Sequence, residues 1–101
     1  MTDEPQDDDE DDDAVEGGLP EPTFALLVSN FGTQALMELG EIPNPITKRS
    51  EFAPERAKFT IDLLEVIKDK TKGNLDEDEE RFLDGALFEL RMKYVRKLKG
   101  G

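Results

Sequence analysis

The chain has 101 residues, of which 25 are acidic and 13 are basic, and its formal net charge is -12. A chain of this length forms at most one small domain. It contains no Cys and no His, which excludes thiolate nucleophiles, disulfides, thiolate zinc sites and imidazole chemistry. We therefore expect a protein that is not an enzyme and that holds no cofactor.

The sequence also shows no segment for crossing or entering a membrane. No apolar run approaches the roughly 20 residues that a bilayer-spanning helix needs. The first residues are acidic, where a secretory signal would be basic. These features predict a cytoplasmic protein without membrane contact.

The acidic residues are concentrated at the amino terminus. Met1 to Pro22 contains 11 acidic residues and no basic residue, so the rest of the chain is close to neutral. Dense like charge with little apolar surface cannot offset the entropy of ordering a backbone, and we predict a disordered tail over residues 1–22. Its run Asp7 to Asp13 lacks the glycine turn and ligand spacing of a calcium loop, so we expect a diffuse ion cloud and no metal site.

A first helix is predicted over residues 23–39. Apolar residues recur there at helical spacing, Thr23 can cap the start, and Gly40 suits the left-handed residue that follows a helix end. A second stripe on this helix consists of the small residues Ala25, Ser29, Gly32 and Thr33.

Two further helices are predicted after a proline-containing loop. The second covers residues 54–72, with Pro54 at its first position and Gly73 after its end. The third covers residues 76–98, where Asp76 and Glu79 have the spacing of a capping box. Because the turn between them is short, we expect an antiparallel hairpin within an all-α domain of three helices over residues 23–99.

Several segments of this domain match a known pattern. The most specific pieces are KTKGNL, the IDLL before it and the LRM and YV after it, at residues 70–75, 61–64, 90–92 and 94–95. Over nearly all of residues 23–95, the chain resembles a bacterial family catalogued as domain of unknown function eighteen-forty-four. The resemblance implies a helical bacterial protein without an assigned activity, and it adds no site residue.

The first helix is the predicted interaction surface. A domain this small, without disulfide or metal, is often stabilised by oligomerisation. The small residues permit close helix approach and their apolar neighbours supply area, so we predict a homodimer. The expected dimer face consists of Phe24, Ala25, Val28, Ser29, Gly32 and Leu36.

Asp62 and Arg91 lie among apolar neighbours on the second and third helices. We predict that they form a structural ion pair, which would penalise mispacking more than it would stabilise the fold. The alternative is a catalytic carboxylate at Asp62. No second acid, base or nucleophile is placed by the sequence to assist it.

The end of the third helix is basic. Its cationic side chains match the helix dipole, which is the simple explanation of a solvated face. The alternative is a nucleic-acid-associated regulator that uses this face, with the acidic tail as a tethered competitor. This predicted basic surface consists of Lys93, Arg96, Lys97 and Lys99.

Taken together, these patterns favour a non-enzymatic helical interaction module that self-associates through its first helix. We also expect a protein partner other than a second copy of the chain, and the sequence does not identify it. Nucleic acid is the alternative partner, and it is not favoured because no recognised nucleic-acid-binding motif is present.

Overall fold

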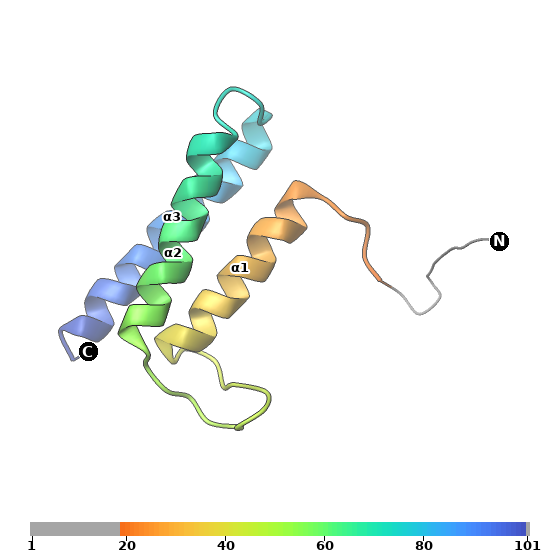
Figure 1. Cartoon of the computed structure of the whole chain (residues 1–101). Helices are drawn as coiled ribbons and strands as arrows, with labels where there is room; N and C mark the ends of the chain where they lie inside the picture. Colours follow the sequence, from red (N-terminus) through yellow and green to blue (C-terminus); the bar gives the residue numbers. More distant parts are fainter. Residues whose placement is uncertain (1–18, 101) are drawn as a thin grey trace.

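The structure is a computed structural model that describes residues 19–100. This part of the chain contains three helices, α1 (Phe24–Leu39), α2 (Pro54–Lys70) and α3 (Glu77–Leu98) (Figure 1). No strand occurs among residues 19–100, which confirms the predicted all-α class. The predicted disorder of the tail falls mostly on residues 1–18, which lie outside the described residues.

Both ends of α1 carry the caps that the sequence predicts. The Thr23 hydroxyl accepts a hydrogen bond from the backbone N–H of Leu26 at 3.0 Å. At the other end, Gly40 adopts a left-handed conformation with a φ of 80°, and its N–H donates to the Met37 carbonyl at 3.1 Å. Glycine adopts this conformation without the steric cost of a Cβ.

The helix α2 ends two residues before the predicted position. Pro54 opens it, as expected for a residue with no N–H to satisfy in the first turn. At the far end, the Thr71 hydroxyl donates to the Ile67 carbonyl at 2.7 Å, and the Thr71 N–H donates to the same oxygen at 3.0 Å. Thr71 therefore caps the helix, and the turn through Gly73 follows it.

The helix α3 starts with the predicted capping box. The Asp76 side chain accepts from the Glu79 N–H at 2.8 Å, and the Glu79 side chain accepts from the Asp76 N–H at 3.0 Å. Two backbone donors that a helix start leaves unpaired are thus satisfied reciprocally.

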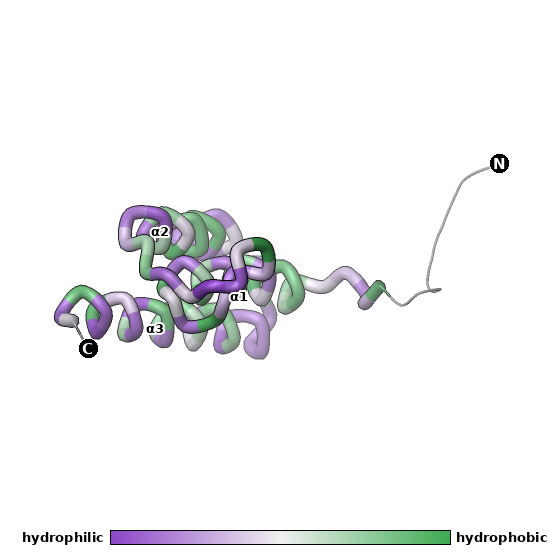
Figure 2. Tube along the Cα trace, turned by 90° about the horizontal axis from the view of Figure 1, so that it is seen from below, coloured by the Kyte–Doolittle hydropathy of each residue, from purple (hydrophilic) through white to green (hydrophobic). Residues whose placement is uncertain are grey.

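The three helices lie side by side with alternating chain direction, so α2 and α3 form the predicted antiparallel hairpin (Figure 1). Each helix contacts the other two. In the view from below, hydrophobic and hydrophilic residues alternate along each helix (Figure 2). The hydrophobic residues buried between the helices are Val28, Ala35, Leu39, Ala57, Ile61, Leu64, Leu83, Leu87 and Leu90.

A polar contact joins the end of α1 to the start of α2. Thr60 is fully buried, and its hydroxyl donates to Glu38 Oε1 at 2.6 Å. The other carboxylate oxygen of Glu38 accepts from Gln34 at 3.2 Å. The Glu38 backbone carbonyl accepts from the Ala53 N–H at 2.7 Å. Buried polar groups need such partners, so these bonds fix how the two helices meet.

Gly85 lies inside α3, where a Cβ would meet no atom within 4 Å. We expect Gly85→Ala to raise the free energy of unfolding by about 0.5–1 kcal/mol, because alanine loses less backbone entropy in a helix. The thermal midpoint should rise by roughly 4–8 °C per kcal/mol for a domain of this size. A lower midpoint in the variant, measured by circular dichroism, would contradict this expectation.

The lengths and compositions of the helices bear on membrane insertion. The most apolar helix, α1, has 16 residues, and the longest, α3, has 22 residues with many charges. Within residues 19–100, no helix is both long enough and apolar enough to span a bilayer.

Candidate interaction surface

The predicted dimer face lies partly inside the molecule. Val28 is 0% exposed and belongs to the core, and Phe24 and Leu36 pack against that core. Ala25 and Ser29 are exposed. Because apolar residues surround much of α1, the sequence pattern does not separate its core side from its free side. Val28 is therefore corrected from a surface residue to a core residue.

The free side of α1 borders an apolar groove of about 340 Å³ between α1 and α3. Gly32 lies at this groove, and a Cβ there would meet no atom within 4 Å. Phe82 stands at the rim with 43% of its surface exposed. The groove is lined from α1 by Val28, Ser29, Gly32, Thr33 and Leu36, and from α3 by Phe82, Ala86, Glu89, Leu90 and Lys93.

The charges along α3 are arranged by sign. Its first turn carries only acidic charges, from Glu77 to Glu80, and its last turn contains Arg96 and Lys97. Both sets match the helix dipole, which favours negative charge at the amino end and positive charge at the carboxyl end. The side of the groove formed by α3 therefore leads from an acidic end to a basic end.

The four cations of the predicted basic surface differ in their exposure and in their neighbours. Lys93 Nζ lies 4.0 Å and Lys97 Nζ 3.9 Å from the carboxylate of Glu41, in the loop after α1. Both lysines are half-buried, whereas Arg96 and Lys99 are exposed. Within the described part of the chain, neither Arg96 nor Lys99 forms a salt bridge. Two of the four cations therefore have a carboxylate nearby, and two do not within the described residues.

The structure corrects the predicted Asp62–Arg91 pair. Asp62 is exposed and accepts from Lys58, one turn earlier on α2, at 2.8 Å. Arg91 instead bonds to Glu65. Glu65 is half-buried at the side of α2 that faces α3, whereas Asp62 points to solvent. Helical spacing alone did not distinguish these two acids.

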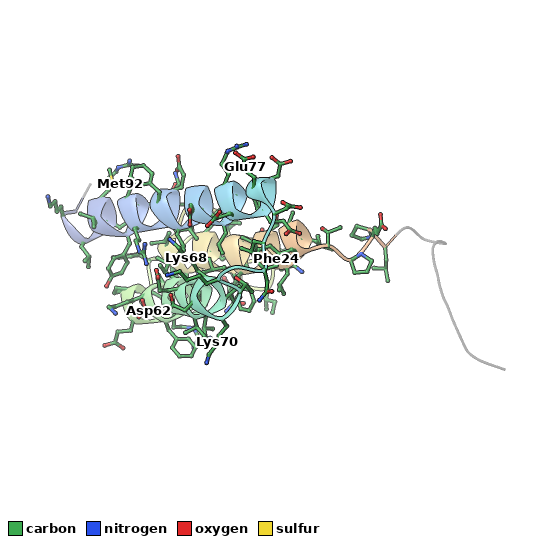
Figure 3. All side chains as sticks on the ribbon, turned by 90° about the horizontal axis from the view of Figure 1, so that it is seen from above. Phe24, Asp62, Lys68, Lys70, Glu77 and Met92 are labelled. Atoms are coloured by element: carbon green, nitrogen blue, oxygen red, sulfur yellow. The ribbon has the colours of Figure 1, made fainter. Side chains whose placement is uncertain are left out.

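A second ion pair also joins α2 to α3. Lys68 Nζ lies 3.0 Å from Asp84 Oδ1, and Figure 3 shows Lys68 between the two helices. The hydrogen bond to Asp84, and then the charge of Asp84, raises the pKa of Lys68 above its usual value. The corresponding bond to Asp62 raises the pKa of Lys58. Lys58 is exposed and Lys68 is half-exposed, so water screens both pairs and they contribute little to stability.

A polar cleft that the sequence did not predict lies between α1 and the loop that follows it. Its volume is about 590 Å³. Asn44 organises the loop, because its side chain accepts from the N–H groups of Ile46 and Thr47 at 2.7 and 3.2 Å. The cleft contains the ion pair Arg49–Glu51 at 3.5 Å, so its charges are largely compensated. The prolines on either side of Asn44 were the sequence signal for this turn.

Metal binding and the candidate carboxylate were the remaining possibilities to compare with the structure. Among residues 19–100, no group of three or more acidic, His or Cys side chains is placed to hold a metal ion. Asp62, the candidate carboxylate, lines none of the four cavities described for this part of the chain.

The comparisons with known proteins identify a family. The family model described as Domain of unknown function (DUF1844) matches residues 21–96. The chain belongs to this family, which confirms the resemblance found in the sequence. Searches of curated proteins and of solved structures find no match.

Proposed function

We propose that this family member is a non-enzymatic helical interaction module that self-associates through the groove between α1 and α3. The observation that carries the proposal is the groove itself, an open apolar surface lined by small residues of α1. An exposed apolar groove on a small soluble domain is typical of an interaction site. The small residues allow a second helix to approach closely.

The occupant that fits best is a second copy of this chain. In a two-fold dimer the same surface appears on both sides, so it must complement itself. Phe82 projects at one end of the groove and Leu36 lies in it, so an antiparallel arrangement would place Phe82 of each copy over the other copy's groove, with Gly32 near the axis.

The size of the core gives a reason for association. Few large side chains among residues 19–100 are fully buried, and the only hydrophobic types in this core are Ala, Val, Ile and Leu. Domains of this size rarely reach high stability from one core alone. Burial of the groove in a dimer would remove Phe82 and Leu36 from water and add hydrophobic stabilisation.

The test is Gly32→Leu with Asn30→Leu as its matched control. A Cβ at Gly32 would meet no atom within 4 Å, so a leucine side chain can start there and project into the groove, where its bulk would exclude a second copy. Asn30 is exposed on the same helix and does not line this groove. At about 10 µM, light scattering should give a dimer mass for the wild type and for Asn30→Leu, and a monomer mass for Gly32→Leu.

Two results of this experiment would count against the proposal. A monomer mass for the wild type would show that the protein does not self-associate. A dimer mass for a folded Gly32→Leu variant would retain the dimer but place its interface elsewhere. Circular dichroism of each variant shows whether the helices are intact, so a change of mass is not confused with unfolding.

A further inference from the structure

We propose that the outer face of α3, on the side away from the other two helices, binds an amphipathic helix of another protein that carries acidic residues beside its apolar stripe. The proposal concerns a different surface from the groove and does not depend on self-association. It rests on an exposed apolar stripe and on the cations that flank it.

The stripe consists of four large apolar side chains at helical spacing. Their exposed fractions are 65%, 48%, 46% and 55% for Phe88, Met92, Val95 and Leu98, in that order. Intervals of three and four residues place them along one side of the helix. Figure 3 shows Met92 on the side of α3 that is turned away from α1 and α2. The core residues Leu83, Leu87 and Leu90 lie on the other side of α3 from Met92, whereas Leu98 lies toward the edge of the stripe, eight residues after Leu90 and eleven after Leu87.

The helix α3 is thus apolar on two sides. One side is used by the core, and the other has no partner in the described part of the chain. Isolated exposed apolar residues are ordinary, but a contiguous row over about three turns indicates a contact surface. The row spans about 15 Å at 1.5 Å per residue, which matches a docked helix of three to four turns.

The charges beside the stripe determine the kind of partner. Arg96 and Lys99 are exposed at its carboxyl end and form no salt bridge within residues 19–100, whereas Lys93 and Lys97 have Glu41 nearby. Arg91, also beside the stripe, contacts Glu65 and is half-exposed. An apolar row with unpaired cations at its edge is complementary to an apolar row flanked by carboxylates.

Other occupants fit these observations less well. The tail of this chain is acidic, but residues 1–18 contain only Met1, Ala14 and Val15 as apolar residues, too few to cover the stripe. A nucleic acid offers a phosphate backbone to the cations but no apolar row to cover the stripe, and an anionic lipid surface is separated from an acidic helix by the experiment below. An acidic amphipathic helix satisfies both the apolar row and the cations.

The experiment uses two synthetic probes and the full chain. Each probe is an alanine-based helix of about 18 residues with leucines at i, i+4, i+7 and i+11, flanked by glutamates in one probe and by lysines in the other. Fluorescence anisotropy should show binding of the glutamate probe with a Kd of about 10 µM and much weaker binding of the lysine probe. Raising the salt concentration should weaken the glutamate probe's binding, because exposed charges are screened.

Variants then locate the site. Met92→Glu should weaken binding of the glutamate probe by about tenfold or more, and Arg96→Glu combined with Lys99→Glu should weaken it and reduce its salt dependence. Val66→Glu is the control, because Val66 is also an exposed apolar residue, 50% exposed, but lies on α2. It should leave the affinity unchanged.

Three outcomes would overturn the proposal. One is equal binding of the two probes, and another is unchanged binding in Met92→Glu. The third is no probe binding together with Met92-dependent binding to vesicles that contain phosphatidylserine, which would make a lipid surface the occupant. The number of chains in the wild-type assembly should be the same with and without the probe, so this test is separate from that of the groove.

Discussion

Replacing Leu64 by alanine is expected to lower the free energy of unfolding by about 2–5 kcal/mol. Leu64 is 0% exposed and belongs to the cluster in which α2 meets the other two helices. Its truncation removes buried apolar surface and leaves a cavity that rigid helices cannot close fully. For a domain whose total stability is about 5–10 kcal/mol, this loss is a large fraction of the whole.

Urea unfolding followed by circular dichroism at 25 °C measures this loss. Val66→Ala is the matched control, because Val66 lies on the same helix and is half-exposed. Its effect should stay within about 0.5 kcal/mol. A loss below about 1 kcal/mol in Leu64→Ala would mean that α2 is not packed as described.

The second large effect is expected at Gly40. Its φ of 80° strains any residue with a Cβ, and a Cβ there would lie 3.2 Å from the backbone carbon of Glu51. Backbone atoms cannot rotate away as the end of a side chain can. Gly40→Ala should therefore lower the free energy of unfolding by about 1–3 kcal/mol.

Gly73 gives a control for the part of this effect that comes from the contact. It has a similar φ of 85°, but a Cβ there would meet no atom within 4 Å. Gly73→Ala should show only the conformational cost of about 1 kcal/mol. If the two alanine variants lose the same stability in urea unfolding, the close approach of the loop to the end of α1 does not contribute.

The features that the sequence predicts correctly are local. Thr23 and the Asp76–Glu79 capping box act on donors within one turn of their own residues, so spacing along the chain is enough to recognise them. Gly40 likewise ends α1 by its own conformation. The all-α class and the α2–α3 hairpin follow from such local signals together with the short turn.

The features that the sequence misses depend on how the helices are rotated against one another. Asp62 and Glu65 are less than one turn apart, and only the packing of α2 on α3 decides that Glu65 reaches Arg91. Val28 and Gly32 are one turn apart on α1 and both line the groove, yet Val28 is fully buried in the core and Gly32 is only half-buried. The approach of Glu41 to Lys93 depends on the course of the loop after α1, which helical spacing does not specify.

The neighbours of the basic residues at the end of α3 bear on the nucleic-acid alternative. Two of its four cations have a carboxylate nearby within the domain, and the other two lie beside an apolar stripe. A phosphate backbone is best met by several cations on one surface. Because two of these charges are partly compensated and an apolar stripe lies beside the other two, we favour the proposed apolar partner with acidic flanks over a nucleic acid.

The measurement that tests the central claim most directly is sedimentation equilibrium of the full chain at several concentrations. Self-association through the groove predicts a mass of twice 11.4 kDa at about 10–100 µM, with dissociation on dilution. The Gly32→Leu variant should remain at 11.4 kDa over the same range. A wild-type mass of 11.4 kDa at every concentration would contradict the account.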